Sequence, residues 1–522
     1  MPSILQHKQK LLAGVATTIF LSACGDSPQT EFPNDETSVV LFLVDTLRAD
    51  HLGCYGYERD TSPNLDALAA KGLRFEHCLS QSTWTRPSTA SIHTGLYPSQ
   101  HGVNVIGSIV HERFHTLAEV LQGNGFRTAA FGYNPHVFSE RIGFNQGFER
   151  FQEMLSPGEV EDPDPLRMDH GARAPRIVDA ALDWLDEIGG ERSFLYVHLI
   201  DAHMPYQPPS PFDELFRDGV AIPEHDVWDL TNNYSSLSPE ERQLVTDLYD
   251  GEIASLDQEL GRFLRGLEER GRMENTLFLF VSDHGEELGD HGGFGHGNGQ
   301  MYDEIVRVPF VMHVPGLAPE WRGQAVDSLV QQVDLLPTVV DVLGLPRPDG
   351  LPGTSVLTSD LEPARLRGRV GISEVQGATS YRKALMLDDT KYIRTWLPGT
   401  GEEFFALGTD AQERHNLLEQ SPGIANRHRE LLQRHIVSSP GRYRFDVRNT
   451  GLEPILVEGA MHTGSAPIVE GQLRDAEPDD GPYTVIPIDL DGVEVVAFHF
   501  TFQLEPGDHD GLIFSPPPDA HE

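Results

Sequence analysis

Short apolar runs alternate with longer stretches of helical pattern along most of this chain. Five runs have the length and composition of strands: Val39–Val44, Thr128–Phe131, Phe194–Leu199, Leu277–Val281 and Pro309–Val314. Continuously apolar strands separated by helices are typical of a sheet that is covered by helices on both faces. The pattern therefore predicts an α/β fold, and 39% hydrophobic residues among 522 are enough to bury a large core.

One helix is especially clear in the sequence. Ser238-Pro239-Glu240-Glu241 combines a capping box with proline at the first helical position. Apolar residues then recur at helical spacing: Leu244, Leu248, Ile253, Leu256, Leu260, Phe263, Leu264 and Leu267. We interpret this stripe as core packing.

The N-terminus has the pattern of a secretory signal. Lys8 and Lys10 precede an apolar stretch that is too short to span a bilayer, and small residues lead to Cys24. The segment resembles a bacterial lipobox, with cleavage before Cys24 and acylation of its thiol; the alternative is an ordinary signal peptide. We expect a signal peptide over 1–23, a polar tether over 24–37, and a lipoprotein anchored to a membrane outside the cytoplasm, in the periplasm or at the cell surface.

The charge balance excludes one class of partner. Asp and Glu number 80 against 39 Lys and Arg, a formal net charge of −41. Such a chain has no general basic face for nucleic acid or anionic lipid. Only five of the cations are lysines, at positions 8, 10, 71, 383 and 391.

Past residue 440, runs such as Tyr483–Asp489 and Val493–Gln503 predict a β-rich accessory domain over 440–522.

Polar residues follow three of the predicted strands. The first ends in Asp45, the third leads to His198, Asp201 and His203, and the fourth leads to Asp283, His284, His291 and His296. In open α/β sheets ligands bind beyond the carboxyl ends of the strands. Asp and His are also the ligand types that divalent cations select. Each residue alone is explained by a turn or a cap, but together they predict a metal site.

Six segments carry a resemblance to a known family. In chain order they are VVLFLVDTLRADHLGCYGY, STWTRPSTASIHTGLYPSQHGV, RTAAFGYNPH, FLYVHLIDAHMPYQPP, YDGEIASLDQELGRFL and VSDHGEELGDHGGFGHGNGQMYDEIVRVPFV. They resemble the sulfatase family, within the alkaline phosphatase superfamily, from Val39 to about Leu418. The resemblance implies a sandwich built on a large mixed central sheet flanked by helices over 38–350. It also implies a small C-terminal α+β subdomain over 351–439.

The sulfatase pattern breaks at the nucleophile. Sulfatases carry Cys or Ser, x, Pro, Ser, Arg, and oxidise the first residue to formylglycine. Here the stretch runs from Thr85 to Thr89, and oxidation of Thr85 would give a ketone, which hydrates poorly. Two lysines that contact sulfate in the family match Asn134 and His296. We therefore do not expect a formylglycine mechanism.

The same departures resemble the phosphodiesterases, phosphatases and phosphoethanolamine transferases of the superfamily. That resemblance implies that Thr85 coordinates a metal and attacks phosphorus, at the start of a helix expected near Ser88. The implied first metal site is Asp45, Thr85, Asp283 and His284. His203 and His296 either bind a second ion, with Asp201 as a further ligand, or bind the substrate phosphate. His136 and Asn134 match substrate-contact positions, whereas His101, His198 and His291 receive no role.

The sequence thus predicts a metal-dependent hydrolase or transferase that cleaves phosphate mono- or diesters through a metal-bound Thr85. One alternative is a sulfuric ester hydrolase without formylglycine, and a second is a catalytically silent metal-binding lipoprotein. Mixed Asp and His ligation favours zinc or manganese, as one ion or two, with calcium as a further option. The expected substrate is a small-molecule, lipid or glycan ester, and the expected membrane contact is the anchor at Cys24.

Overall fold

A computed structural model describes most of the chain. It covers residues 33–154, 173–220, 234–296, 299–366, 368–376, 380–397 and 399–438, and beyond these only strands between 443 and 514. The predicted signal peptide, Cys24 and most of the tether lie outside the described residues. Within the described ranges no helix is long and apolar enough to cross a membrane.

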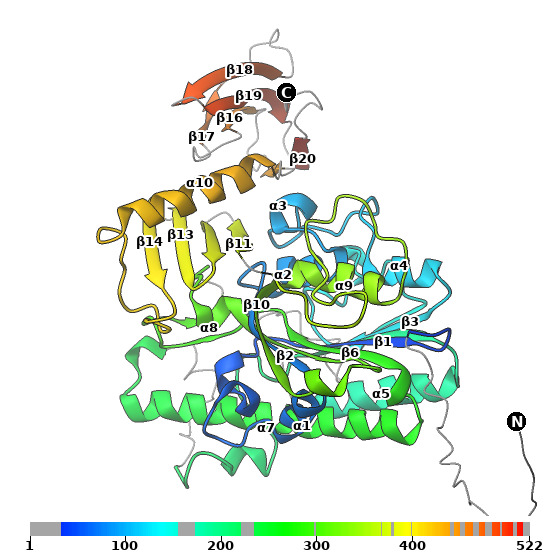
Figure 1. Ribbon diagram of the computed structural model, residues 1–522. Helices are drawn as coiled ribbons and strands as arrows, with labels where there is room; N and C mark the ends of the chain where they lie inside the picture. The colour runs from blue at the N-terminus through cyan, green and yellow to red at the C-terminus, as the bar shows by residue number, and fades with distance from the viewer. Residues whose placement is uncertain are drawn as a thin grey trace, which may run out of the picture. The chain divides into compact units, whose positions relative to one another are not determined.

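The centre of the fold is an eight-stranded mixed sheet (Figure 1). Its strands, in spatial order, are β10 (Gln324–Gln331), β2 (Leu73–Leu79), β9 (Arg307–His313), β6 (Thr276–Ser282), β1 (Ser38–Val44), β5 (Ser193–Leu199), β3 (Arg127–Gly132) and β4 (Arg150–Glu153). All five predicted strands are present, and β1 lies parallel to both β5 and β6. The large mixed sheet implied by the resemblance is confirmed.

Strand β9 runs antiparallel to both of its neighbours, β2 and β6. Among its described residues, the segment between β6 and β9 contains the short strands β7 (Glu287–Leu288) and β8 (Phe294–Gly295) and helix α8 (Asp303–Val306), and no other helix or strand. For β9 to run parallel to β6, the connecting segment would have to cross back to the end of the sheet where β6 begins. The segment instead stays at the end where β6 finishes, so β9 returns in the opposite direction.

Alternate residues of β1 enter two different cores. Val40 and Phe42 pack with α1 (Pro63–Lys71), α5 (Arg173–Glu187) and α7 (Pro239–Glu269). Val39 and Leu41 pack with α2 (Thr85–Thr94), α4 (Leu117–Gly123) and α9 (Leu335–Val342). Figure 1 shows the two helix groups on opposite faces of the sheet. Both faces of the strand are covered, which agrees with its continuous apolar run from Val39 to Val44.

Helix α7 begins where the sequence predicts. Ser238 Oγ accepts a hydrogen bond from Glu241 N at 3.2 Å, and Ser238 N donates to Glu241 Oε2 at 2.7 Å. This reciprocal capping box satisfies two backbone donors of the first turn. The apolar stripe that follows faces the first core, as expected.

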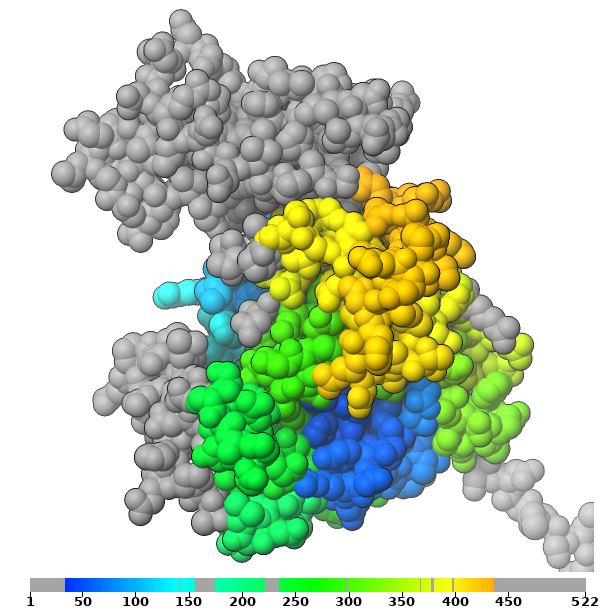
Figure 2. Space-filling view, turned by 90° about the vertical axis from the view of Figure 1, so that its left-hand side faces the viewer, coloured from blue at the N-terminus to red at the C-terminus, as the bar shows by residue number. Residues whose placement is uncertain are grey.

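A second, antiparallel sheet forms the C-terminal subdomain. Its strands are β11 (Val370–Gln376), β12 (Tyr381–Leu387), β13 (Thr390–Leu397) and β14 (Gly401–Ala406), followed by α10 (Pro422–Ser438). Figure 2 shows this subdomain, in yellow and orange, against earlier residues in green and blue. Lys391 of β13 is buried and bonds Asp303 Oδ1 at 2.5 Å and Glu413 Oε1 at 2.9 Å.

The β-type runs predicted beyond residue 440 are strands. They are β15 (Tyr443–Arg448), β16 (Ile455–His462), β17 (Val469–Arg474), β18 (Tyr483–Leu490), β19 (Val493–Leu504) and β20 (His509–Phe514). All their pairings are antiparallel, β15 with β20 and the others in the order β17-β16-β19-β18. The domain boundaries themselves stay predictions.

Candidate active site

The ends of two neighbouring strands bring three predicted metal ligands together. Val44 of β1 lies opposite Ser282 of β6, so Asp45 and Asp283 leave the sheet at the same level. His284 follows, and ligand atoms of Asp45, Asp283 and His284 all lie within 4.8 Å of one another. All three side chains are fully buried. Among the described residues this is the only group of three or more His, Cys, Asp or Glu side chains so placed.

Two carboxylate oxygens of this cluster have no hydrogen-bond partner within the described part of the chain. Neither Asp45 Oδ1 nor Asp283 Oδ2 receives a hydrogen bond from the described residues. His284 Nε2 lies 3.8 Å from Asp45 Oδ1 and 3.4 Å from Asp283 Oδ2. Two acceptor oxygens buried without donors are costly unless a cation binds them.

The tautomer of His284 also fits a cation. Its Nδ1 lies 2.9 Å from Gly285 O, so Nδ1 carries the proton and Nε2 keeps its lone pair. Burial, with the nearby His296, lowers the pKa of His284 to about 3, which keeps the ring neutral. Gly285 lets the chain pass close to the backbone of Glu304, because a Cβ there would lie 2.0 Å from Glu304 O.

The two carboxylates have opposite pKa shifts. Burial alone would raise the pKa of Asp45, but the hydrogen bond from His198 and the nearby imidazoles of His203 and His284 hold it well below the usual range. Burial and the charge of Asp45 raise the pKa of Asp283 far above its usual range. Adjacent buried carboxylates resist double ionisation unless a cation offsets their charge. The donor set and its electrostatics therefore fit a divalent cation.

Thr85 completes the predicted first site. Helix α2 begins at Thr85, three residues earlier than the sequence predicts, and Trp84 provides no side-chain cap. The hydroxyl oxygen lies 3.3 Å from His284 Nε2 and 3.5 Å from Asp45 Oδ2. The first intrahelical bond joins Ser88 N to Trp84 O, so the N–H groups of Thr85 and Arg86 remain available to an anion.

His203 and His296 lie together at the same end of the sheet. Their rings are nearly perpendicular with centroids 5.0 Å apart, and the His296 centroid is 4.4 Å from that of His284. His203 Nδ1 is 2.6 Å from Met204 O. The structure thus brings both histidines to the cluster, as predicted from the strand ends.

Glu286 is a site residue that the sequence analysis missed. It is fully buried, and its Oε1 lies 2.9 Å from His296 Nδ1. Burial would lower the pKa of His296, but the charge and hydrogen bond of Glu286 raise it. The available signal was a glutamate two residues after His284, in the segment SDHGEE.

His136 and Asp201, two further predicted site residues, contact other parts of the chain. The guanidinium of Arg86 donates to the backbone oxygen of His136 at 3.2 Å and lies 3.4 Å from His136 Nδ1. Burial and this arginine lower the pKa of His136 to about 4. Asp201 Oδ1 accepts a hydrogen bond from Ala174 N of α5 at 3.1 Å, and Asp201 does not belong to the ligand cluster. Its role as a second-ion ligand stays a prediction.

Asn134 has contacts that differ from those of a substrate-facing side chain. Its Nδ2 donates to Asp45 Oδ2 at 2.6 Å, and its Oδ1 accepts from His136 N at 2.7 Å. The residue is 1% exposed. In the structure Asn134 holds Asp45, a predicted metal ligand, and its own predicted substrate contact remains untested.

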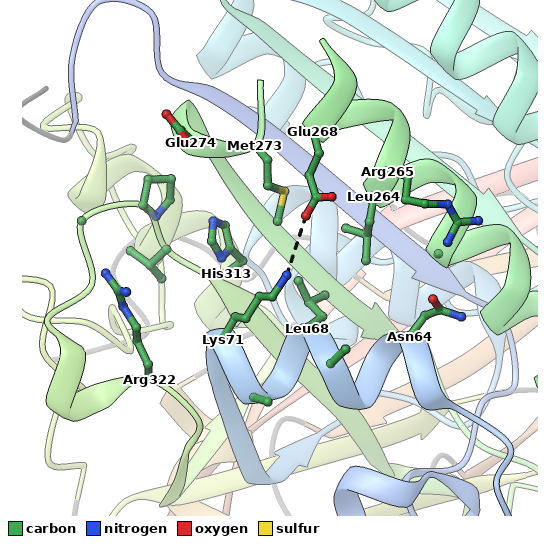
Figure 3. A pocket seen from close by; sticks show the side chains of 16 residues that line it. Asn64, Leu68, Lys71, Leu264, Arg265, Glu268, Met273, Glu274, His313 and Arg322 are labelled. Atoms are coloured by element: carbon green, nitrogen blue, oxygen red, sulfur yellow. Dashed lines mark ion pairs between the residues drawn. The ribbon is translucent and has the colours of Figure 1, made fainter. Parts of the chain in front are cut away.

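A cavity of about 820 Å³ lies elsewhere (Figure 3). It lies between α1, α7 and the end of β9, with Lys71 and Glu268 paired at 3.7 Å. His313 of its lining pairs with Phe278 near the start of β6. Asp283 follows Phe278 by five positions along β6, a distance of roughly 16 Å. No predicted site residue lines this cavity.

Comparison with known proteins identifies the family. The family model described as Sulfatase matches residues 37–345, which span the central sheet and all the site residues. The chain belongs to the sulfatase family. A second model, N-sulphoglucosamine sulphohydrolase, C-terminal, matches residues 289–436 and so includes the antiparallel sheet of the subdomain. The sulfatase family consists of ester hydrolases, and members of the wider superfamily use divalent metal.

Relatives of known name are distant. An arylsulfatase of Clostridium perfringens is 28% identical over 445 residues, covering 73% of this chain and 90% of that protein. An N-acetylglucosamine-6-O-sulfatase of Bacteroides thetaiotaomicron is 24% identical, covering 68% and 76%. The crystal structure of a phosphonate monoester hydrolase of Agrobacterium radiobacter matches with a TM-score of 0.63 at 22% identity, covering 77% of this chain and 96% of that one. This structural match shows the same fold.

Proposed function

We propose that this sulfatase-family protein cleaves phosphate esters, with Thr85 as nucleophile beside a divalent cation held by Asp45, Asp283 and His284. The observation that supports this most directly is the position of the Thr85 hydroxyl, 3.3 Å from His284 Nε2 and at the start of α2. A hydroxyl at that point is next to the ligand cluster and to the unpaired N–H groups of the helix.

The proposed reaction has two steps. Thr85 Oγ attacks phosphorus, an Oγ–P bond forms, the bond to the leaving oxygen breaks, and the hydroxyl proton passes to solvent while the leaving oxygen takes one up. Water then attacks the phosphothreonine, which releases phosphate or its monoester and restores the hydroxyl. When bound, the cation supplies Lewis-acid chemistry that lowers the pKa of a hydroxyl and offsets anionic charge.

The surrounding groups of the chain orient the ester. The N–H groups of Thr85 and Arg86 donate to non-bridging oxygens at the start of α2. His296 lies beside His284, and His203 beside His296; in this proposal both bind the same oxygens. Glu286 fixes the orientation of the His296 ring through Nδ1.

The positions of the described lysines favour phosphate over sulfate. Lys383 is buried in an ion pair with Glu374, and Lys391 in ion pairs with Asp303 and Glu413. Lys71 lines the distant cavity. No lysine of the described residues therefore occupies the place of the two sulfate-contacting lysines, and Thr85 cannot supply the formylglycine aldehyde.

Sulfate ester hydrolysis by the same Thr85 is the second candidate. The similarity to the Clostridium perfringens arylsulfatase favours it. Matched 4-nitrophenyl phosphate, bis(4-nitrophenyl) phosphate and 4-nitrophenyl sulfate separate the two. A higher kcat/KM on either phosphate supports our proposal, and a higher value on the sulfate overturns it.

The role of Thr85 is tested with three variants of the full chain. Thr85→Ala should reduce phosphate ester turnover by about 1,000-fold or more, whereas Thr85→Ser, which keeps the hydroxyl, should retain measurable turnover. Thr89→Val is the matched control, because Thr89 lies one turn further along α2, is buried and has no hydrogen-bond partner for its hydroxyl. Unchanged turnover in Thr85→Ala would refute the proposal.

We also propose that Cys24 is acylated and anchors the protein outside the cytoplasm. The lipobox pattern at Leu21 to Cys24 is the support. In bacterial fractionation the wild-type protein should enter the membrane fraction and Cys24→Ala should not. Equal distribution of the two proteins would count against the anchor.

A further inference from the structure

The two oxygens of Asp45 have different surroundings. Oδ2 lies 2.6 Å from Asn134 Nδ2, 3.3 Å from His198 Nε2 and 3.5 Å from Thr85 Oγ1. Oδ1 receives no hydrogen bond from the described residues and faces His284 Nε2 at 3.8 Å. Donors on one oxygen therefore leave the other for a cation.

The proton of His198 is fixed by its neighbour on β5. Tyr196 and His198 are two residues apart on the strand and share a face. The Tyr196 hydroxyl lies 2.8 Å from His198 Nδ1. If Nδ1 carried the proton, the lone pair of Nε2 would face the carboxylate oxygen of Asp45 at 3.3 Å. The favourable arrangement has the hydroxyl donating to Nδ1 and the Nε2 proton donating to Asp45.

Packing holds these hydrogen bonds from Tyr196 to His198 and from His198 to Asp45, here called the relay, in place. Tyr196 and His198 are both fully buried. The Tyr196 ring contacts His93 edge-on, with centroids 4.6 Å apart, and stacks on Phe138 at 6.1 Å. Water cannot replace the hydroxyl without displacing these rings, so the Tyr196 hydroxyl has no easy substitute as a donor to His198.

We propose that Tyr196 and His198 are positioning residues that orient Asp45 so that Oδ1 alone faces the cation. The inference rests on the proposed function only in requiring that the Asp45 cluster bind a divalent cation. Without the relay, Asn134 and Thr85 are the only described residues that hold Oδ2 of Asp45, so the carboxylate rotates more easily and exchanges its oxygens. Such rotation would weaken cation binding and release the contact with the Thr85 hydroxyl.

Three variants distinguish the parts of the relay. His198→Leu removes both ring nitrogens, and Tyr196→Phe removes only the hydroxyl. His198→Gln keeps a donor for Asp45 and an acceptor for Tyr196. Tyr97→Phe is the matched control, because the buried Tyr97 hydroxyl bonds Gln331 Oε1 at 3.2 Å, away from the cluster. All four leave Asp45, Asp283, His284 and Thr85 unchanged.

The readout is the dissociation constant for Mn²⁺, measured by calorimetry on chelator-treated full-length protein. Loss of an outer-shell partner costs about 10- to 100-fold in metal affinity. We expect a loss of that size in His198→Leu, a smaller loss in Tyr196→Phe, and affinities near wild type in His198→Gln and Tyr97→Phe. Equal affinity of wild type, His198→Leu and Tyr196→Phe would overturn the inference and leave the proposed function intact. A wild-type protein that binds no Mn²⁺ or Zn²⁺ would overturn both.

A spectroscopic readout tests the relay without any metal. In ¹⁵N-histidine-labelled protein, His198 should be the tautomer with the proton on Nε2, and its signals, assigned by their loss in His198→Gln, should shift in Tyr196→Phe. A proton on Nδ1 of His198 would overturn the inference. This measurement remains decisive if His198→Leu does not fold.

Discussion

Asp45 and Asp283 leave neighbouring parallel strands at the same level, and each directs one oxygen that lacks a donor toward His284 Nε2. Without a cation the two carboxylates repel each other when both are ionised, and burial and the charge of Asp45 accordingly raise the pKa of Asp283. Cation binding and stability are therefore linked at this pair.

Neutralising Asp283 should separate binding from stability. We expect Asp283→Asn to lose the bound divalent ion, measured by elemental analysis, because an amide is a weaker ligand than a carboxylate. In chelator-treated protein the same variant should melt a few degrees higher than wild type, since the repulsion with Asp45 is removed.

The control for this prediction is Asp257→Asn. The carboxylate of Asp257 accepts hydrogen bonds from Asn64 N, Asn64 Nδ2 and Leu65 N, at 2.7 to 2.9 Å. That variant should melt lower with and without the ion. A lower melting temperature for chelator-treated Asp283→Asn would contradict the account of the Asp45 pair.

Removing the cation should destabilise the wild-type protein. Because the three ligands are brought together only in the folded state, an ion at 100 times its Kd adds about 2.7 kcal/mol to the free energy of unfolding. We expect chelation to lower the melting temperature of wild type and to leave that of Asp283→Asn unchanged. Differential scanning calorimetry measures both, and an equal drop in both proteins would place the ion elsewhere.

Glu286→Gln should reduce turnover without removing the cation. Its carboxylate bonds His296 Nδ1 at 2.9 Å and fixes the ring near the cluster. We expect kcat/KM to fall by about 10- to 100-fold at unchanged metal content. The neighbouring Glu287→Gln is the control, because Glu287 bonds backbone N–H groups of His291 and Gly293. Loss of metal in Glu286→Gln would assign Glu286 to the ligand cluster instead.

Glu374 should dominate the acid stability of the C-terminal subdomain. Burial would raise its pKa, but the charge of Lys383 and the hydrogen bond from His435 hold the pKa well below its usual range. A carboxylate with a depressed folded-state pKa contributes stability above its unfolded pKa of about 4.3 and loses it as the pH falls toward the folded value.

Replacing Glu374 with glutamine leaves Lys383 buried and unpaired. The expected cost is about 3 to 5 kcal/mol at pH 7, and below pH 4 the gap to wild type should narrow. Glu149→Gln, which breaks an exposed pair with Arg127, should cost less than about 1 kcal/mol. Denaturant unfolding at pH 7 and pH 3.5 measures both, and a gap that widens in acid would refute the assigned shift.

The residues at the strand ends were predictable because strand direction and side-chain chemistry are local features. Asp45, Asp283 and His284 follow continuous apolar runs, and parallel neighbours place such residues at one edge. The position of Thr85 came from the family resemblance. The start of its helix was predicted three residues too late, because Trp84 carries no capping side chain that would mark the start in the sequence.

The supporting residues were not predictable in the same way. Glu286 contacts His296 across a turn, and Tyr196 of β5 reaches Asp45, at the end of β1, only through His198. The antiparallel direction of β9 likewise depends on how the segment after β6 folds, which an apolar run alone does not specify. Contacts of this kind arise from tertiary packing.

The central claim is that Thr85 is the nucleophile on a phosphate ester. The most direct measurement is peptide mass spectrometry of the full-length protein, loaded with Mn²⁺ or Zn²⁺ and quenched in acid during turnover of bis(4-nitrophenyl) phosphate or 4-nitrophenyl phosphate. The account predicts a phosphoryl group, with or without the retained ester, on Thr85 and on no other residue of α2. Turnover of either ester with no modification of Thr85, together with full activity of Thr85→Ala, would contradict it.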